Sequence, residues 1–437
     1  MQTGEVQKRG RTAAIVSWVL YDFGMAWFSM VVLTAYFILY FKQVVVGGDK
    51  GTGDLLWGVA VSTAMALSVV ISPFLGAVAD MRRNKKTFLV ACAGTSIVST
   101  SLLYFTGPGQ WVWTMFLVVS GYTGYTVAMT FYNAFLPEIA GSGAVEKISG
   151  IGWGVGYIGG LIALLCMAAL VPTVAAGKSI LLLTGAVYAV FALPSFFLLG
   201  ESREGTAPGA GSVADGFRRI AATFREIRSY RRIFIFLFGY FFVSDAISTV
   251  IVFFSSYTVE TLHFTVSQNF LLLMLIQITA AAGAMASGLL AGRIGALGTV
   301  TLSIAVWIAA LLGLFAFSGI PAFYALSVCA GLVLGSTQAA ARSYIAIESP
   351  RGKEAEFFGF MTFTSKVAAI FGPLVYGLIS KKTGNPRFAI LSLELFFIAG
   401  FLILLQVPRS GPGASAGKER HGNGPSAPTA PSSPSGR

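Results

Sequence analysis

The chain has 437 residues, of which 55% are hydrophobic and only 11% are charged, and its mean hydropathy is +0.76. Soluble domains carry about 25% charged residues, so this composition excludes a soluble globular protein and predicts an integral membrane protein. The net charge of +12 comes from lysines and arginines in short gaps between apolar runs. That distribution is typical of cytoplasmic loops rather than of a nucleic-acid-binding surface, and we expect no nucleic-acid partner.

The cysteines and histidines indicate neither a disulfide framework nor a metal site. Cys92, Cys166 and Cys329 are widely spaced within apolar runs, and the only histidines are His263 and His421. Metal clusters need several such ligands close together. The sequence also contains no Walker loop and no motif that assembles a nucleophile and a base. We therefore expect no metal, no cofactor and no enzymatic activity.

Twelve mostly apolar runs follow one another, each of roughly the 20 residues that a helix needs to cross a bilayer. The first, from Ile15 to Phe41, is too long for a signal-peptide core and lacks a small-residue cleavage site, so we expect it to be retained. The predicted spans are 14–41, 54–79, 87–106, 110–135, 149–171, 179–199, 232–259, 267–291, 298–318, 321–345, 357–380 and 387–407. The sequence thus predicts an all-α, polytopic membrane protein with twelve transmembrane helices.

The longest hydrophilic gap divides these spans into two bundles of six helices. Its second part places Phe217, Ile220 and Phe224 on one helical face with arginines opposite, which predicts an amphipathic helix on the inner leaflet; a solvated linker is the alternative. The final residues, rich in Gly, Ser, Pro and Ala, cannot form a core. The expected units are a cytoplasmic N-terminal segment (1–13), a first six-helix bundle (14–199), the cytoplasmic linker (200–231), a second six-helix bundle (232–407) and a disordered cytoplasmic tail (408–437).

Lysine and arginine are distributed unevenly between the two sets of loops. If both termini are cytoplasmic, 23 of the 30 basic residues fall in inner segments, six in outer segments and one, Lys366, within a span. Cytoplasmic loops are enriched in basic residues, so both termini are predicted to be cytoplasmic, in the cell membrane if the source is prokaryotic. Lys381, Lys382 and Arg387 lie in an outer segment against this trend.

Matching motifs occur at the inner ends of the second and eighth spans, GAVADMRRNKK from Gly76 and GLLAGRIGALG from Gly288. Both resemble the loop motif of the major facilitator superfamily, Gly-x-x-x-Asp-Arg-x-Gly-Arg-Arg. Met81 and Arg83 depart from it in the first copy, and Gly292 departs from it in the second. The resemblance implies two parallel six-helix repeats. It also implies a gating or loop role for Gly76, Asp80, Arg82, Arg83, Lys85 and Arg293.

Longer stretches resemble one branch of this superfamily. They are SWVLYDFGMAWFSMVVLTAYF from Ser17, FYNAFLPEIA from Phe131, KISGIGWGVGYIGG from Lys147, SDAIST from Ser244, STQAAARSYIAIESPRGKEAEFFGF from Ser336 and SKVAAIFGPLVYG from Ser365. Together they are similar to the branch related to the fungal autophagy-linked vacuolar amino-acid effluxer, over residues 15–406. This resemblance implies a bacterial-type permease that exports amino acids.

Four charged residues stand out within the spans, where each costs roughly 2.5–3.5 kcal/mol at a helix centre. Asp22 and Asp245 occupy the first and seventh spans, which line the central cavity in the superfamily, and Lys366 and Glu394 occupy the last two. We expect Asp22 or Asp245 to bind a substrate ammonium group or a coupling proton, and Lys366 to face a carboxylate. The alternative is a buried structural pair, such as Lys366 with Glu394 or Asp245.

Polar and aromatic residues on neighbouring spans complete the candidate site. Arg342 and Asn133 fall near the inner helix ends, where Arg342 is expected to close an inner gate by reaching Asp22 or Glu138; an arginine at lipid phosphates is the alternative. The candidate binding residues are Asp22, Asp245, Lys366, Tyr21, Tyr125, Asn133 and Gln338.

Small residues repeat every fourth position in two spans. They are Gly152, Gly156 and Gly160 in the fifth span and Ala284, Gly288 and Gly292 in the eighth. Such spacing lets helix backbones approach closely. Since the resemblance implies that these two spans meet across the halves, we expect them to form smooth faces on which one bundle rocks against the other.

These observations favour a transporter that works by alternating access and exports a small solute such as an amino acid, with proton coupling at Asp22 or Asp245. Efflux of lipophilic cations is the alternative within transport, and a non-transporting membrane receptor or scaffold is the alternative of another class. The expected partners are a small-molecule substrate, protons and the lipid bilayer, and we expect a monomer.

Overall fold

The computed structural model describes residues 2–47, 51–82, 84–140, 145–200, 230–316, 320–349 and 354–408. Within these ranges the regular elements are all helical. The amphipathic helix expected in 200–231 and the tail expected at 408–437 lie outside the described residues, apart from their first or last positions. Arg83 and the side chains of Asp80 and Arg82 also lie outside them.

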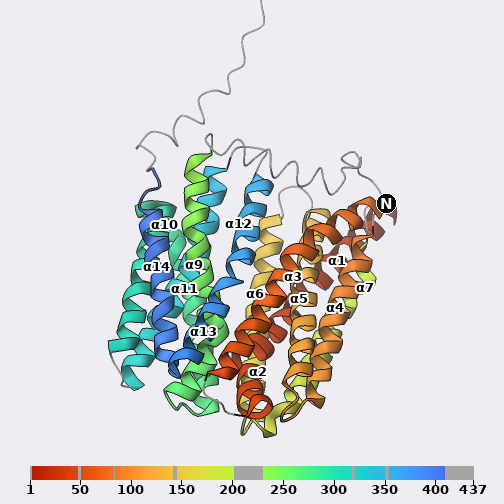
Figure 1. Cartoon of the computed structure of the whole chain (residues 1–437). Helices are drawn as coiled ribbons and strands as arrows, with labels where there is room; N and C mark the ends of the chain where they lie inside the picture. The colour runs from red at the N-terminus through yellow and green to blue at the C-terminus, as the bar shows by residue number, and fades with distance from the viewer. Residues whose placement is uncertain are drawn as a thin grey trace, which may run out of the picture.

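Two helical bundles stand side by side, as Figure 1 shows. The N-terminal half comprises α1 (Gln2–Phe28), α2 (Phe37–Tyr40), α3 (Thr52–Arg82), α4 (Lys85–Leu102), α5 (Trp111–Ala140), α6 (Val145–Leu170) and α7 (Ser179–Leu198). The C-terminal half comprises α9 (Arg231–Ser256), α10 (Val266–Ala316), α11 (Ile320–Glu348), α12 (Glu354–Ala368), α13 (Phe371–Thr383) and α14 (Pro386–Leu404).

The first and seventh spans both contain π-helical turns. In the first span α1 continues through η1 (Ser29–Ala35), α2 and η2 (Phe41–Val46), and in the seventh α9 continues into η5 (Tyr257–Thr261). Such turns are rare and frequently mark functional sites. The two spans are therefore irregular at equivalent ends, η2 in one half and η5 in the other.

Eleven helices in the described part of the chain are long and apolar enough to cross a membrane. α10 accounts for the difference from the twelve predicted spans. Its 51 residues would extend about 77 Å at 1.5 Å per residue, more than twice the roughly 30 Å of a bilayer core. Gly295 interrupts it with φ 78° and ψ 161°, a conformation that glycine adopts without steric cost. α10 therefore contains the predicted span 267–291 and the part of the predicted span 298–318 up to Ala316, joined at Gly295.

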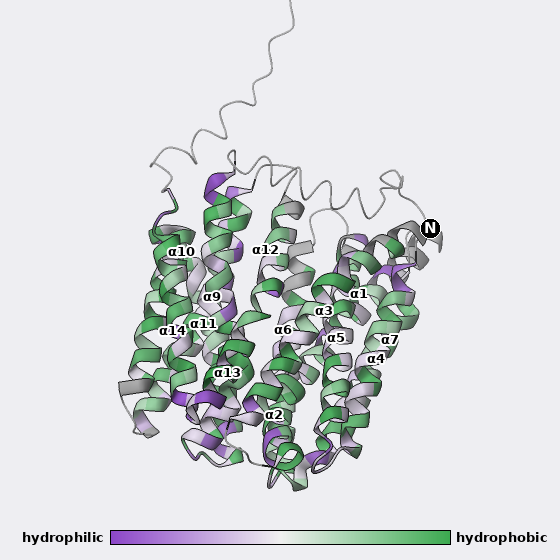
Figure 2. Cartoon of the chain, in the orientation of Figure 1, coloured by the Kyte–Doolittle hydropathy of each residue, from purple (hydrophilic) through white to green (hydrophobic). Residues whose placement is uncertain are grey.

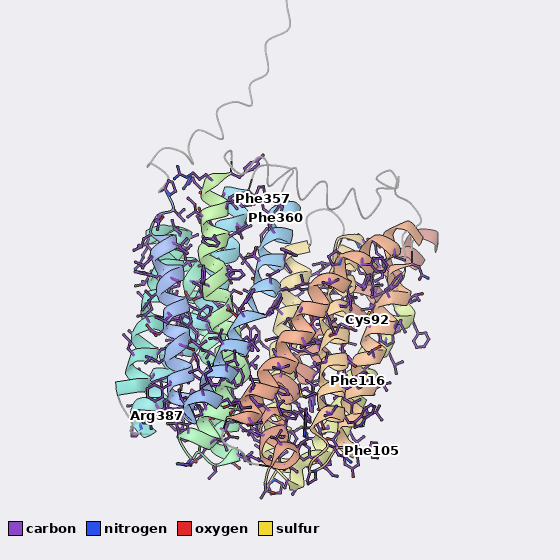
Figure 3. All side chains as sticks on the ribbon, in the orientation of Figure 1. Cys92, Phe105, Phe116, Phe357, Phe360 and Arg387 are labelled. Atoms are coloured by element: carbon purple, nitrogen blue, oxygen red, sulfur yellow. The ribbon has the colours of Figure 1, made fainter. Side chains whose placement is uncertain are left out.

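The surface matches a lipid environment. Hydrophobic residues dominate the middle of both bundles, and hydrophilic segments gather towards the two ends (Figure 2). Large apolar side chains point outward, including Phe105 and Phe116, which are 68% and 58% exposed (Figure 3). Exposing so much apolar surface is unfavourable in water. The chain is thus an integral, multi-pass membrane protein.

The N-terminal half is held together by aromatic and hydroxyl contacts around α1. The Trp27 indole donates a hydrogen bond to Thr184 of α7 at 3.2 Å, and the Ser195 hydroxyl donates to the Ser17 carbonyl oxygen at 2.7 Å. Because these polar atoms are buried, each contact satisfies a group that would otherwise be costly to desolvate. They fix the orientation of α1 within its bundle.

Different segments of the chain lie at the two ends of the molecule. α1 begins and α14 ends at one end, at the top of Figure 1, which we call the terminus side. η2 and η5 end at the opposite end, which we call the far side.

Candidate functional site

Lys366 is a cation inside the membrane-spanning region at the contact between the two halves. It lies near the end of α12, and its ammonium group donates a hydrogen bond to the Thr130 hydroxyl of α5 at 3.2 Å. Thr130 is in turn 3.4 Å from the Ser72 hydroxyl of α3. No ion pair to Lys366 occurs among the described residues. An ammonium group in this position lacks a counter-charge, which a carboxylate ligand would supply.

Asp22 lies within the N-terminal half, where α1 meets α5 and α6. Its carboxylate is adjacent to the Tyr132 hydroxyl, and a Cβ added at Gly152 would overlap with it. Trp18 and Tyr132 stack beside it with ring centroids 4.4 Å apart. The side chain is half-buried, and it has no ion pair within the described ranges. Asp22 therefore presents an uncompensated negative charge next to an aromatic stack.

Asp245 caps a break in the eleventh span. Pro373 lacks an N–H and disfavours a continuous helix before it, and the span is divided into α12 and α13. This leaves the Gly372 N–H in the first turn of α13 without an intrahelical partner. The Asp245 carboxylate of α9 accepts a hydrogen bond from it at 2.8 Å. Its second oxygen, Oδ2, is buried and has no hydrogen-bond partner.

The expected structural pairs of Lys366 with Glu394 or Asp245 are not formed. Glu394 is 4% exposed on α14, and neither of its carboxylate oxygens has a partner among the described residues. Asp245 faces the N-terminus of α13, and Lys366 faces Thr130. The three side chains point to different neighbours, because the break in the eleventh span separates Lys366 from Gly372.

The other candidate binding residues differ in how accessible they are. Tyr21 is fully buried, and its hydroxyl lies 3.1 Å from that of Tyr188 inside the N-terminal half. Tyr125 is half-buried and stacks on Phe28 with a centroid distance of 4.9 Å. Gln338 is half-buried on α11, and Asn133 is exposed near the end of α5.

Arg342 does not make the expected contact with Asp22 or Glu138. Its guanidinium lies over the Trp153 ring, 4.7 Å from the centroid, and so joins α11 of one half to α6 of the other on the terminus side. Glu138 instead accepts a hydrogen bond from Lys85 at 3.0 Å. A planar guanidinium favours an aromatic face, and Trp153 lies within reach.

The fifth and eighth spans meet across the halves as expected, as α6 and α10, but most residues of their glycine repeats do not lie at that contact. A Cβ at Gly152 or Gly156 would meet α1 of the same half, at Asp22, Trp18 and Ala26, and one at Gly288 or Gly292 would meet no heavy atom within 4 Å. Gly160 alone of the fifth-span repeat reaches α10, where Gln277 Nε2 would lie 2.9 Å from its added Cβ. Sequence reasoning missed Gln277, although a single glutamine in an apolar run is an available signal.

Sequence reasoning also missed a buried ionic cluster on the far side, which we call the Lys42 cluster. The Lys42 ammonium group of η2 donates hydrogen bonds to Asp54 of α3, Ser256 of α9 and Glu260 of η5. The Ser380 hydroxyl of α13 donates to the second Asp54 oxygen. The cluster joins both halves, and the side chains of Lys42 and Asp54 are only 6% and 1% exposed.

A neighbouring contact accounts for one of the basic residues that opposed the loop trend. Arg387 lies at the far side of the C-terminal half (Figure 3), where its guanidinium is close to the Tyr257 side chain. It therefore stabilises the turn that carries Glu260.

Comparison with known proteins identifies the family. The family model described as vacuole effluxer Atg22 like matches residues 56–412. The chain belongs to this family. It is 30% identical over 406 residues to the MFS-type transporter YxiO of Bacillus subtilis (strain 168), covering 90% of this chain and 94% of the relative. It is 25% identical to the autophagy-related protein 22 of Yarrowia lipolytica, covering 80% of this chain and 75% of that protein.

The fold of this Atg22-like protein is that of the major facilitator superfamily. A nucleoside transporter NupG mutant superimposes with a TM-score of 0.71 at 14% identity, covering 91% of this chain and 99% of the other. That identity shows the fold alone. Together, the family and the fold support the transport of a small molecule across a membrane.

The loop motifs of the Atg22-like chain lie at the terminus side. Asn84 caps α4, since its side chain accepts a hydrogen bond from the Thr87 N–H at 3.3 Å. Lys85 follows it and binds Glu138 of α5, within the same half. Arg293 and Gly288 of the second copy are exposed. The described residues of the motif thus connect helices inside one bundle.

Proposed function

We propose that this transporter exports a small zwitterionic solute, such as an amino acid, by alternating access, and that it acts as a monomer. The observation that carries this proposal is Lys366, an ammonium group at the contact between the halves, hydrogen-bonded to Thr130 and without an acidic partner in the described part of the chain. A solute carboxylate would neutralise it. The description of the family as a vacuole effluxer supports export.

Asp22 would receive the other end of the solute. Its unpaired carboxylate suits an ammonium group or a coupling proton, and it lies against α5, the helix that also carries Thr130. Asp245 would act indirectly, because it holds the start of α13 and hence the break that follows Lys366.

The excess of basic residues in the loops of the terminus side supports a cytoplasmic location for that side. With this orientation the far side faces outward and is closed by the Lys42 cluster. The terminus side is joined by the contact between Arg342 and Trp153. Both sides are then joined across the halves, and uptake of a solute from the cytoplasm would require the contact between Arg342 and Trp153 to open.

The test is ligand-induced stabilisation of the purified protein. A ligand that binds only the folded state raises the melting temperature. We expect neutral amino acids to do so, and their matched amino alcohols, which lack the carboxylate, to have little effect. Lys366→Met should weaken amino-acid binding about 10- to 100-fold, since a hydrogen bond to a charged group contributes roughly 1.5–3 kcal/mol.

Lys381→Met is the matched control, because Lys381 is an exposed lysine on the other segment of the same span. It should bind amino acids as the unsubstituted protein does. Equal stabilisation by amino acids and amino alcohols, or unchanged amino-acid binding in Lys366→Met, would contradict the role of Lys366.

Efflux of a lipophilic cation is a second candidate, and the Asp22 environment favours it. A carboxylate beside the stacked rings of Trp18 and Tyr132 is suited to a cation with apolar substituents. Stabilisation by lipophilic cations, lost in Asp22→Asn and retained in Lys366→Met, would support this candidate in place of the zwitterion.

A further inference from the structure

We propose that the Lys42 cluster binds one proton each time the far side closes and releases it when that side opens, so that closure of the far side depends on pH. This inference rests on the alternating access proposed above. It concerns a set of residues remote from Lys366, and its test needs no solute.

The cluster is formed by both halves and would be taken apart when they separate at the far side. Lys42 and Asp54 come from the N-terminal half, and Ser256, Glu260 and Ser380 come from the C-terminal half. The Ser256 hydroxyl also lies 3.3 Å from Asp54, across the same boundary. Opening the far side would therefore return two carboxyl groups and one ammonium group to water.

The charges within the cluster do not balance. One ammonium group, that of Lys42, faces two carboxyl groups, those of Asp54 and Glu260. With both carboxyl groups ionised the closed cluster has a net charge of −1. A proton on either carboxyl group would make it neutral.

Among the residues that the structure describes, those around the cluster do not supply the missing positive charge. Tyr376 approaches the carboxyl groups as a neutral phenol. The Arg387 guanidinium is close to Tyr257, and Lys381 and Lys382 are exposed. In the described part of the chain none of these three cations forms an ion pair with Asp54 or Glu260.

Because the cluster is buried, its unbalanced negative charge is energetically costly. Transferring an uncompensated charge out of water costs several kcal/mol, and ionisable groups avoid that cost by changing protonation. In the open state the two carboxyl groups would be hydrated and ionised near neutral pH. Closing the far side would therefore take up one proton. Glu260 offers a route for it, since its side chain is 26% exposed whereas that of Asp54 is 1% exposed.

The backbone supports a functional role for the cluster. Lys42 lies in the π-helical turn η2, and Glu260 lies in the π-helical turn η5, at equivalent ends of the first and seventh spans. π-turns re-aim side chains and occur frequently at functional sites. Here the two turns direct a lysine and a glutamate towards each other.

The experiment measures the closed fraction of the far side against pH in nanodiscs without solute. Spin labels at Ala175→Cys and Ser267→Cys, two exposed positions at the far side of opposite halves, report the distance between the halves. Cys92, Cys166 and Cys329 are replaced by alanine in this background. Binding of one proton on closure would raise the closed-to-open ratio by up to about tenfold for each unit of pH decrease.

Glu260→Gln and Asp54→Asn each leave one carboxylate beside the Lys42 ammonium group. The cluster is then neutral without binding a proton. In both variants the closed fraction should be high and independent of pH. Glu138→Gln, a carboxyl substitution on the terminus side, should retain the pH dependence of the unsubstituted protein.

A flat response of the unsubstituted protein between pH 5 and 8, or a full pH dependence in both Glu260→Gln and Asp54→Asn, would overturn this inference. Either result would leave the proposed zwitterionic solute unaffected, because no solute is present. Conversely, a failure of amino acids to bind, with the pH dependence intact, would overturn the solute and leave the proton site standing.

Discussion

The two sides of the protein join the halves by different chemistry. On the far side Lys42, Asp54 and Glu260 form a buried ionic cluster between the halves. On the terminus side the contact between Arg342 and Trp153 is a cation–π interaction of an exposed arginine. In the described part of the chain the ion pairs on that side, Lys85 with Glu138 and Arg232 with Glu348, each connect two helices of one half.

This difference indicates which side controls the equilibrium between conformations. Breaking a buried ion pair by removing one partner costs about 3–5 kcal/mol, whereas a cation–π contact at an exposed site contributes roughly 0.5–1 kcal/mol. Substitutions on the far side should therefore shift the equilibrium much further than those on the terminus side. The same pair of spin labels can measure all of these effects.

The largest effect is expected for Lys42→Met, which removes the cation and leaves Asp54 and Glu260 facing each other. At pH 8 the closed-to-open ratio of the far side should fall at least about a hundredfold, from a loss of roughly 3–5 kcal/mol. Lys381→Met, at an exposed lysine of the same side, is the control and should leave the ratio unchanged. A change in this ratio smaller in size than the change caused by Arg342→Gln would contradict the comparison.

Gly58→Ala tests the backbone contact beside the cluster. A methyl group at Gly58 of α3 would overlap with the Pro373 carbonyl oxygen of α13, and neither backbone can yield as a side chain would. Overpacking costs about 1–3 kcal/mol, so the labels should show the closed state weakened about five- to 150-fold. Gly154→Ala, where an added Cβ meets nothing within 4 Å, should have no such effect. An unchanged distance distribution in Gly58→Ala would show that α3 and α13 need not touch.

On the terminus side Arg342→Gln should produce a smaller change in the same distance distribution, of about two- to fivefold, towards the state with the terminus side open. Trp153→Leu should give a similar change, and the double substitution should add little to either. Additive effects would show that the two residues act on the equilibrium independently, and not through their mutual contact.

The helical class, the two bundles and the family could be predicted, because they depend on hydropathy and on local motifs. The partners of the buried charges could not. The sequence places Asp245 within the seventh span. Its role as a cap for α13, however, follows from a break in the eleventh span, which is distant in the sequence. In the sequence Lys42 has the position of an interfacial lysine at the end of a span. Its partners Ser256 and Glu260 are 214 and 218 residues away along the chain.

The glycines illustrate the same limit. A spacing of four residues predicts a smooth helical face, but it does not say which helix that face meets. Gly152 and Gly156 pack on α1, whereas Gly58 and Gly377, which no repeat singled out, lie at the contact between α3 and α13. Their importance comes from the register of two helices that belong to different halves.

The smallest effect is expected where the resemblance to the superfamily loop motif implied gating. Lys85 and Glu138 are partly exposed and join α4 to α5 within the N-terminal half, so Glu138→Gln should change the labelled distance distribution less than Arg342→Gln does. An exposed ion pair contributes about 0.2–1 kcal/mol, and here that contribution stabilises one bundle without distinguishing the open state from the closed. Its loss should appear as a melting temperature lowered by at most a few degrees. A shift of the equilibrium as large as that of Gly58→Ala would instead place a gate at the loop motif and remove the asymmetry between the two sides.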